Sequence, residues 1–274
     1  MQDLPRYESE KIALNLRFAD GLAWSHAGFL AVADVRQRKI FKFDRDPHPQ
    51  VLIAGDGGAS GLSYDLQGRL YICESETRRV TRLDPKGNIE TLAEGYQGKK
   101  FNAPNDIVVR RDGHIYFTDP AFGSANDGRE LDFYGIWHIT PKGDLEVLSK
   151  WQTRPNGITL SPDGRVLFVS DSDRHAVVAF DLDRGGQAGG NQRDAIKNIA
   201  GVPGGLRTDV DGRLYVAASG VAVYSPAGRL QRTLLQGERT TNCTFGEGTL
   251  ESLFIAARDS IYRVKIGVKG ALQY

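Results

Sequence analysis

A turn followed by a run of alternating apolar residues recurs six times along this chain of 274 residues. Five copies start at glycines and a degenerate sixth starts at a leucine: Gly28, Gly68, Gly113, Gly164, Gly212 and Leu250. The period is roughly 40–50 residues, which is the length of one four-stranded propeller blade. A lone four-stranded sheet exposes both faces and both edges, whereas a radial arrangement buries face against face. The sequence therefore predicts an all-β, six-bladed β-propeller with four-stranded antiparallel blades around a central pocket.

Short strands and turn tetrads fill each repeat. Residues 40–44 and 80–84 alternate apolar and polar side chains with a period of two. Asp84-Pro85-Lys86-Gly87 is typical of the turns, because Pro presets φ and Gly accepts a positive φ. We expect the segment around Lys11–Leu16 to pair with the last blade and close the ring. Asp183–Gln192 is expected to be a surface loop, and only Asp194–Ile199 hints at a helix. The chain is interpreted as one propeller domain, residues 1–274.

Composition narrows the class of partner. The chain is 40% apolar and 25% charged, with a net charge of +1 and no basic stripe, so nucleic acid is not an expected partner. No apolar run is long enough to span a bilayer, which predicts no membrane partner. We expect Cys73 and Cys243 to be buried and reduced, which fits the cytoplasm. The alternative location is outside the cell, for a mature form whose leader has been removed. A monomer or weak dimer acting on a small molecule is expected.

One position in the repeat indicates a binding site. The residue about eight places before each repeated run opens the innermost strand, beside the central shaft. These six ring positions hold Asp20, Ser60, Asn105, Asn156, Gly204 and Asn242. Each could be a plain turn residue, since Asn after Pro often bonds its own backbone. A purely structural need would repeat one residue in all six copies, so the variation favours a ring of oxygens that holds a hard cation or a polar small molecule.

These residues carry a family resemblance that covers nearly the whole chain. The matching segments are Asp20-Gly21-Leu22-Ala23-Trp24, Cys73-Glu74, Asn102-Ala103-Pro104-Asn105-Asp106, Phe117-Thr118-Asp119-Pro120, Arg154-Pro155-Asn156-Gly157-Ile158 and Asn242-Cys243-Thr244-Phe245-Gly246. Together they resemble the senescence-marker-protein/gluconolactonase/luciferin-regenerating-enzyme-like family, and most closely its bacterial gluconolactonase branch. The resemblance implies a six-bladed propeller that opens sugar lactones with one divalent cation, Ca²⁺ or Zn²⁺, in the central pocket.

The resemblance also assigns roles at the ring. It implies cation ligands at Asp20, Asn105 and Asn156, with Asp20 standing where the family has a longer Glu. Gly204 stands where the family has a ligating Asp, so the resemblance predicts weak cation binding. Ser60 and Ser75 also depart from the family pattern. Substrate contacts are expected at the following ring positions: Asn105, Ser60, Asn242 and Gly204.

Acid–base roles are less clearly marked. We expect Glu74 and Asp106 to be catalytic, with Glu74 as the general base that assists an attacking water. The other interpretation of Glu74 is a salt bridge with Arg78 or Arg79. Asp119 and Asp171 are expected to cap strand ends. The turn-like contexts of His26, His48, His114 and His175 predict exposed side chains.

The predicted function is a divalent-cation-dependent small-molecule hydrolase, most simply a lactonase that uses a metal-activated water. Two alternatives stay open. One is a metal-free tailoring enzyme that acts on a non-sugar substrate in the same pocket, as in strictosidine-synthase-like propellers. The other is a ligand-binding propeller without catalysis, because a fold does not fix a function.

Overall fold

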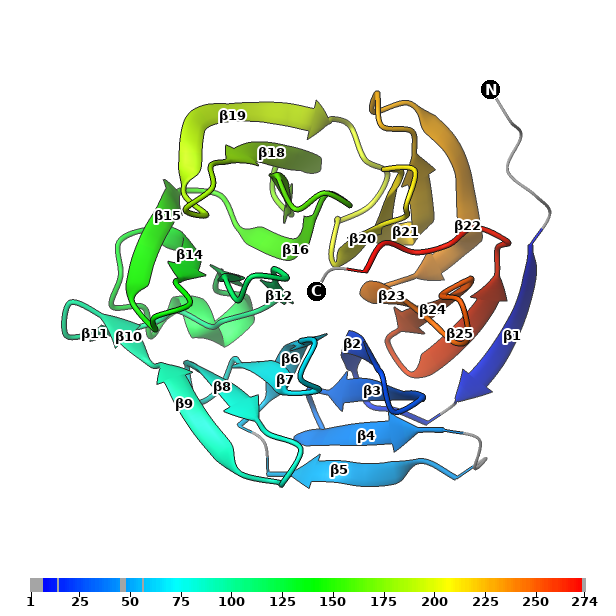
Figure 1. Ribbon diagram of the computed structural model, residues 1–274, viewed down its shortest axis with the longest axis horizontal. Coiled ribbons are helices and arrows are strands. Elements are labelled where there is room, and N and C mark those ends of the chain that lie inside the picture. Colours follow the sequence, from blue (N-terminus) through cyan, green and yellow to red (C-terminus); the bar gives the residue numbers. More distant parts are fainter. Residues whose placement is uncertain (1–6, 14, 45–47, 56, 273–274) are drawn as a thin grey trace.

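Six small antiparallel sheets stand radially around one central shaft in the computed structural model of the chain (Figure 1). The structure describes residues 7–13, 15–44, 48–55 and 57–272. Each sheet is one blade, and consecutive blades follow one another around the ring in chain order. The predicted all-β, six-bladed propeller is confirmed.

The first three blades follow the expected pattern of four strands in sequence order. Blade 1 contains β2 (Ala19–Ser25), β3 (Phe29–Asp34), β4 (Lys39–Phe43) and β5 (Gln50–Ala54). Blade 2 contains β6 (Ala59–Tyr64), β7 (Leu70–Glu74), β8 (Arg79–Leu83) and β9 (Ile89–Ala93). A two-stranded hairpin, β10 (Gly95–Tyr96) and β11 (Lys99–Lys100), leads to blade 3, which contains β12 (Ile107–Val109), β13 (Ile115–Asp119), β14 (Tyr134–Ile139) and β15 (Leu145–Trp151).

The last three blades vary the pattern. Blade 4 contains β16 (Pro155–Leu160), β17 (Val166–Asp171), β18 (Ala176–Leu182) and β19 (Ala188–Ile196). Blade 5 contains β20 (Leu206–Thr208), β21 (Leu214–Tyr224) and β22 (Leu230–Arg239). The first half of β21 pairs with β20 and the second half with β22, with Gly220 at the junction (φ +81°). Blade 6 contains β23 (Asn242–Gly246), β24 (Ser252–Ala257), β25 (Ser260–Lys265) and β1 (Glu8–Ala13).

The N-terminal strand closes the ring, as the sequence predicts. β1 pairs antiparallel with β25, in the register Glu8 to Lys265 and Glu10 to Arg263. The paired segment begins three residues earlier than the Lys11 expected from the sequence, and Leu14 lies outside the described residues. The strand is exposed along most of its length. Its contribution is therefore mainly the hydrogen bonds it offers to the open edge of β25.

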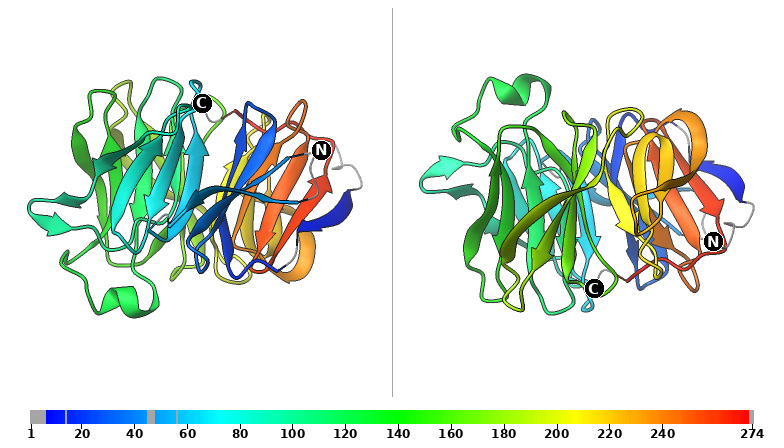
Figure 2. Two further views of the ribbon diagram at one scale, coloured as in Figure 1. Left: turned by 90° about the horizontal axis from the view of Figure 1, so that it is seen from below. Right: turned by 90° about the horizontal axis from the view of Figure 1, so that it is seen from above.

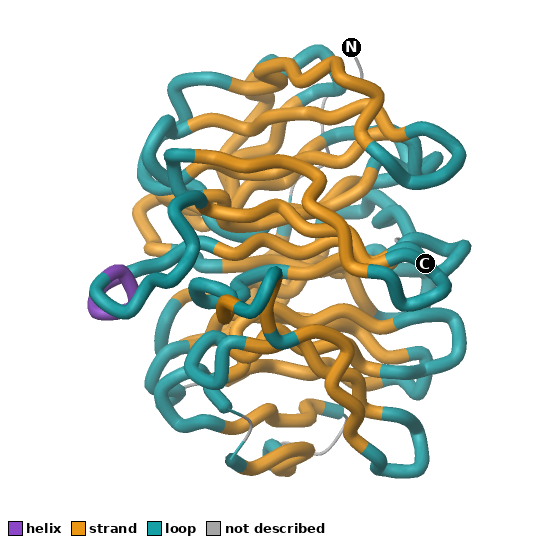
Figure 3. The backbone as a smooth tube through the Cα atoms, turned by 90° about the vertical axis from the view of Figure 1, so that its left-hand side faces the viewer, coloured by secondary structure: helices purple, strands orange, loops and turns teal. Residues whose placement is uncertain are grey.

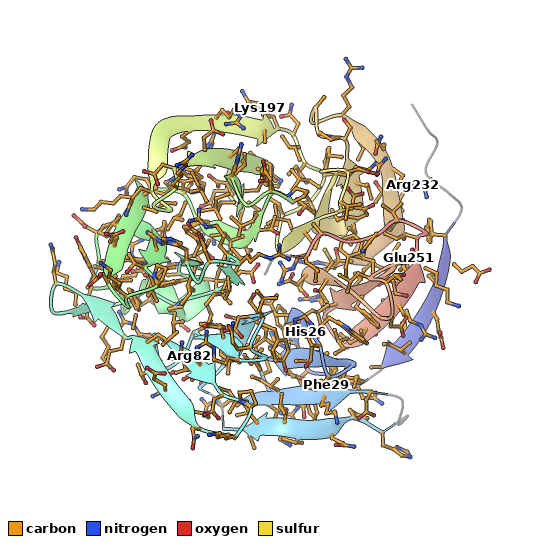
Figure 4. The ribbon with its side chains drawn as sticks, viewed as in Figure 1. His26, Phe29, Arg82, Lys197, Arg232 and Glu251 are labelled. Atoms are coloured by element: carbon orange, nitrogen blue, oxygen red, sulfur yellow. The ribbon has the colours of Figure 1, made fainter. Side chains whose placement is uncertain are left out.

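The hydrophobic core lies between the blades. Six clusters of buried apolar residues fill the six interfaces, each drawn from two neighbouring blades of the described chain. Tyr71 of blade 2 packs with Phe101 and Phe117 of blade 3, for example. Side chains crowd the space between the blades (Figure 4). Cys73 and Cys243 are buried and unpaired within two of these clusters, as predicted.

The two faces of the ring differ in what covers them. A short 3₁₀-helix, η1 (Gly123–Asn126), projects from one face on the loop between β13 and β14 (Figures 2 and 3). The C-terminal segment crosses the opposite face, where Gly270 pairs with Asp209 and the Ala271 N–H donates to the Thr208 carbonyl (3.0 Å). The shaft is therefore covered at one end and open at the other.

Two local predictions were wrong. Part of the expected loop Asp183–Gln192 is the start of strand β19, and only the turn over residues 183–187 precedes it. The hint of a helix at Asp194–Ile199 also fails, since residues up to Ile196 complete β19. Outer strands lie far from the shaft and need little apolar periodicity, so their sequence signal is weak. Among the described residues, no helix is long and apolar enough to cross a membrane.

Candidate active site

Five of the six ring positions line one cavity at the open end of the shaft. The cavity has a volume of about 960 Å³, and its lining includes Asp20, Ser60, Asn105, Asn156 and Gly204. Each lies at or just before the start of an innermost strand, from β2 to β20. Asn242, the sixth, is not among the lining residues. It is buried, and its Oδ1 accepts a hydrogen bond from the Cys243 N–H (2.8 Å).

Glycines directly after the ring positions bring neighbouring blades together. A Cβ at Gly21 would lie 1.9 Å from the Ser60 carbonyl oxygen, and a Cβ at Gly157 would lie 2.3 Å from the Gly204 carbonyl oxygen. Neither distance leaves room for a side chain. The pairing of a ring residue with a glycine is therefore a packing requirement, and it holds the ring residues close to the shaft.

Hydroxyl groups clamp the same junctions. Four serine or threonine hydroxyls each donate to a backbone carbonyl of the next blade: Ser60 to Asn105 (2.7 Å), Thr118 to Asn156 (2.5 Å), Ser170 to Gly204 (2.7 Å) and Thr241 to Ala19 (2.7 Å). Ser60 also lies within bonding distance of the Ser75 hydroxyl and the Pro104 carbonyl. A hydroxyl has one proton to donate. A substrate contact through the Ser60 hydroxyl, as predicted, would therefore compete with its hydrogen bond to the Asn105 carbonyl.

Asp20 is the exceptional side chain of the cavity. Its carboxylate is half-buried, yet no described residue gives it a hydrogen bond or an ion pair. Burial raises the pKa of Asp20 to about 8, and the negative charge of Asp106 adds to the shift. Asp20 is therefore mostly protonated at neutral pH, and its ionised form is costly unless something that enters the cavity compensates the charge.

Two amides share the cavity with Asp20. The Asn105 side chain has no hydrogen-bond partner among the described residues, so its oxygen and nitrogen are both open. Asn156 donates from Nδ2 to the Ser172 hydroxyl (3.0 Å), which leaves its Oδ1 open. The cavity thus offers one carboxylate and two amide oxygens, the three groups that the resemblance assigns to the cation.

This donor set fits a hard cation better than zinc. Calcium takes oxygen ligands from carboxylates and amides, and its affinity falls as carboxylates are lost. Zinc prefers nitrogen and sulfur ligands, and the part of the chain that the structure describes holds no cluster of three His, Cys, Asp or Glu able to bind a metal. Asp20, Asn105 and Asn156 therefore fit Ca²⁺ as a partial site, with one negative charge.

Gly204 is closed to the carboxylate that the family places there. A Cβ on this residue would lie 2.4 Å from the Thr241 carbonyl oxygen of blade 6. The Gly204 N–H donates to the Ala217 carbonyl (2.8 Å), which fixes the backbone in this place. Blades 5 and 6 are thus in close backbone contact at this ring position. A side chain could be restored here only if the backbone moved.

Asp106 lies under the cavity and is not among the lining residues. Its Oδ1 accepts from the Ile107 N–H (3.0 Å), and its Oδ2 accepts from the Ile158 N–H (3.1 Å). Burial raises the pKa of Asp106, an effect that the nearby Arg207 guanidinium (3.9 Å) opposes. Arg207 also lines a small pocket of about 40 Å³ toward the covered end of the shaft. Asp106 and Arg207 therefore form a charged layer between the two ends, and Asp106 acts on the cavity through its charge on Asp20.

Glu74 does not line the cavity either. Its Oε2 accepts from Arg79 Nε (2.7 Å) and Thr77 Oγ1 (2.6 Å), and its Oε1 accepts from Thr81 Oγ1 (2.7 Å). The side chain is 4% exposed. The geometry matches the predicted alternative, a salt bridge with Arg79, and gives no support to a general-base role for Glu74.

Glu74 belongs to a set of acids that anchor strand ends. The others are Asp34 at the end of β3, Asp119 at the end of β13 and Asp171 at the end of β17. Asp119, for example, accepts from the Asn102 and Ala103 N–H groups (2.9 and 2.8 Å). The capping role predicted for Asp119 and Asp171 is confirmed. Glu74 ends β7, the second strand of its blade, so it occupies the same structural position as these three acids.

Sequence reasoning missed the upper wall of the cavity. Loops beyond the ring contribute apolar and basic side chains, among them Phe18, Val35, Phe122, Val202, Arg239 and Arg258. Most follow the second strand of a blade or precede the next ring position. These residues could have been found from the predicted topology, because in a propeller the loops after the second strand of each blade all lie at the same end of the shaft.

Comparisons with known proteins agree with this architecture. The sequence profile of the SMP-30/Gluconolactonase/LRE-like region matches residues 18–258. A gluconolactonase of Zymomonas mobilis is 30% identical over 289 residues, which cover 93% of this chain and 80% of that protein. The solved structure of a gluconolactonase from Xanthomonas campestris superposes with a TM-score of 0.89 and 28% identity, covering 96% of this chain and 91% of that one.

A calcium-binding regucalcin from Agrobacterium tumefaciens shares the fold, with a TM-score of 0.82 and 18% identity over 98% of this chain and 97% of that one. The relatives therefore include lactone hydrolases by name, on the same six-bladed ring. The profile match spans all the ring positions from Asp20 to Asn242. The chain belongs to the SMP-30/gluconolactonase/LRE-like family.

Proposed function

We propose that this protein is a lactone hydrolase that opens its substrate over Asp20, Asn105 and Asn156. One observation carries the proposal: an unpartnered, half-buried carboxylate with a pKa near 8 lies in a large cavity together with two open amides. The gluconolactonases among the relatives support the reaction class. Sugar lactones are the simplest substrates of that class.

The first form of the proposal includes a divalent cation, best Ca²⁺, held by Asp20, Asn105 and Asn156. When bound, such a cation polarises a carbonyl and acidifies a water. Because only one of these three ligands is charged, binding is expected to be weak. Ionised Asp20 would gain the compensating charge that the described residues do not supply.

The chain's own groups account for orientation and proton transfer. Hydrolysis adds the oxygen of water to the lactone carbonyl carbon and breaks the ring C–O bond, and a proton moves from the water to the departing alkoxide. Asn105, whose amide is open, can donate to the lactone or accept from its hydroxyls. Asn156, fixed by Ser172, can accept through Oδ1.

A metal-free form is the second candidate, favoured by two observations. The closed position at Gly204 removes a ligand, and the pKa of Asp20 lies where a carboxyl group can both accept and donate a proton near neutral pH. In this form the Asp20 carboxylate takes the proton of the attacking water and returns it to the alkoxide oxygen. The substrate would be a lactone or ester outside the sugar series.

The test compares three preparations on D-glucono-1,5-lactone, with the spontaneous reaction subtracted. Protein treated with EDTA, the same protein given Ca²⁺ again, and Asp20→Asn are assayed by acid release. We expect Ca²⁺ to restore the activity and Asp20→Asn to lose about 10²-fold or more in kcat/KM. Asp132→Asn is the matched control, because Asp132 is exposed and does not line the cavity.

The outcomes separate the two forms. Activity that survives EDTA but not Asp20→Asn supports the metal-free form. Full activity of Asp20→Asn contradicts both forms, and so does the absence of hydrolysis with every lactone tried. If no lactone is hydrolysed, a ligand-binding role without catalysis would replace the proposal.

The cellular setting and the oligomeric state are part of the proposal. Two buried free thiols are compatible with the reducing cytoplasm. β1 covers the backbone edge of β25 in the last blade, and we propose a monomer or weak dimer. The substrate is a small molecule, and neither nucleic acid nor a membrane is a proposed partner.

A further inference from the structure

Two arginines without partners face the cavity on one side. Arg239 ends β22 and pairs in register with Ser219 of β21, and Arg258 follows β24. Both side chains are exposed, and no described residue gives either an ion pair or a side-chain hydrogen bond. By contrast Arg78, also in the cavity lining, is held by Glu130 (3.1 Å) and by the Phe101 carbonyl (2.5 Å).

Acidic groups are missing from the same wall. Among the described lining residues only Asp20 and Glu76 are acidic, and Glu76 already pairs with Arg38 (2.6 Å). The acidic residues next to the two arginines in the sequence, Glu238 and Asp259, accept hydrogen bonds from other residues. Glu238 accepts from the Tyr262 hydroxyl (3.0 Å), and Asp259 accepts from the Ser260 hydroxyl (2.8 Å).

The backbone connects the wall with the arginines to Asp20. The Arg258 carbonyl accepts a hydrogen bond from the N–H of Ala19, the residue before Asp20, and Ala19 and Arg258 form an antiparallel β-bridge. On the other side, Gly204 has no side chain, and no described acidic residue of blades 5 and 6 is in the cavity lining. Guanidinium groups bind carboxylates and phosphates through paired N–H donors.

We propose that Arg239 and Arg258, with the open hydroxyl of Ser219, form an anion subsite, and that the substrate is a lactone bearing an additional carboxylate or phosphate. The inference rests on the proposed lactone hydrolysis and names its substrate class. The cavity volume of about 960 Å³ agrees, since it lies at the upper end of the range for small-molecule sites. The ring oxygens receive the lactone, and the arginines receive the distant anionic group.

The kinetic test compares charged and neutral lactones of the same ring size. D-Glucono-1,5-lactone is neutral and its 6-phosphate carries a phosphate, whereas D-glucono-1,4-lactone is neutral and D-glucaro-1,4-lactone carries a carboxylate. We expect at least one charged lactone to exceed its neutral counterpart about 10-fold in kcat/KM at low salt, mainly through KM. A gain confined to one of the two pairs identifies the anion. Equal kcat/KM within both pairs overturns the proposal.

Variants connect that preference to the two arginines. The double variant Arg239→Ala/Arg258→Ala should lose about 10-fold in kcat/KM on the charged lactone and less than about 2-fold on the neutral one. An equal loss on both would mean that the arginines act on the reaction itself, and it would overturn an anion subsite. Arg229→Ala is the control, since Arg229 is an exposed arginine of the same blade that does not line the cavity.

A binding measurement keeps this proposal separate from catalysis. Calorimetry compares D-gluconate with 6-phospho-D-gluconate and D-glucarate on the wild type and the double variant. We expect 6-phospho-D-gluconate or D-glucarate to bind more tightly than D-gluconate, and the difference to disappear in the double variant. This result supports the subsite even if no lactone is hydrolysed, in which case only the proposed reaction fails. Equal binding of all three compounds by the wild type overturns the subsite.

Discussion

Single residues decide what the cavity can hold. Asp20 brings one ionisable carboxyl group to the ring, and Gly204 brings no side chain. The absence of a side chain at Gly204 is matched by the packing, since a Cβ there would lie 2.4 Å from the Thr241 carbonyl oxygen. The family resemblance predicts a vacant ligand position at this glycine, whereas the structure leaves no space for a side chain there. The cation and the anion proposals both follow from this difference across the ring.

The packing at Gly204 can be tested by adding one methyl group. Gly204→Ala should lower the free energy of unfolding by about 1–3 kcal/mol, because the new Cβ forces the backbones of blades 5 and 6 apart. Gly204→Asp should be destabilised as well and should not bind Ca²⁺ more tightly than the wild type. Urea unfolding and Ca²⁺ titration are the measurements.

Gly128→Ala is the control for Gly204, since Gly128 also lines the cavity but has no heavy atom within 4 Å of an added Cβ. Its free energy of unfolding should stay within about 0.5 kcal/mol of the wild type. A Gly204→Ala protein as stable as Gly128→Ala would mean that the ring has room for a side chain. Tighter Ca²⁺ binding by Gly204→Asp would restore the interpretation of a vacant ligand.

At the scale of elements, the strands were predictable and the contacts between blades were not. Alternating apolar residues define the inner strands, so the sequence placed Asp20, Asn105 and Asn156 in one register and at one cavity. The clamp by Ser60 and the anchoring of Glu74 depend on which blade lies next to them, which a periodic pattern does not encode. The cavity wall at Arg258 comes from a loop and has no period at all.

Blade 3 contains a buried histidine pair, which the sequence did not predict because His114 follows a turn motif. His114 was expected to be exposed, but it is buried, and its Nδ1 lies 2.7 Å from Nε2 of His138 on β14. His138 Nδ1 lies 3.0 Å from Glu146 Oε2 on β15. Both histidines can be neutral if each Nδ1 carries its proton, so that His114 donates to His138 and His138 donates to Glu146. Asp112, Arg110 and Asp183 are the other charged groups that act on the pair.

This pair predicts loss of stability in mild acid. Burial lowers the pKa of both histidines below the usual 6.5, so the unfolded chain binds more protons than the folded one below that pH. The free energy of unfolding should therefore fall as pH falls from 6.5 toward the folded pKa values, by at most about 1.4 kcal/mol per pH unit for each proton.

Urea unfolding of the wild type, His138→Gln and His26→Gln between pH 5 and 8 is the measurement. His138→Gln should flatten the slope below pH 6.5, whereas His26→Gln, which changes an exposed turn residue labelled in Figure 4, should keep it. Identical slopes in all three proteins would show that the pair does not control the acid response.

The whole molecule is a ring, and its closure joins the two ends of the chain. β1 pairs with β25, and its side chains are mostly exposed. Ala19 also forms a bridge to Arg258, and a buried apolar cluster fills the interface between blades 6 and 1. At the surface, Arg263 donates to Glu10 (2.5 Å). The sequence predicted this closure because the last repeat lacks a strand. The same argument indicates that opening this junction would expose the core between blades 6 and 1.

A disulfide across the junction tests the closure directly. Glu8 and Lys265 are paired Cα partners, and both are exposed. Opposite residues in antiparallel strands lie about 4.5–5.5 Å apart, within the range of a disulfide. Glu8→Cys/Lys265→Cys should form the bond on oxidation and raise the free energy of unfolding by about 2–4 kcal/mol, because the closed loop includes nearly the whole chain.

The control is Glu8→Cys/Arg263→Cys, which is two residues out of register and should not form the bond. The buried thiols Cys73 and Cys243 lie out of reach. Equal cross-linking of both pairs, or a bond that leaves stability unchanged, would mean that β1 does not hold the ring closed.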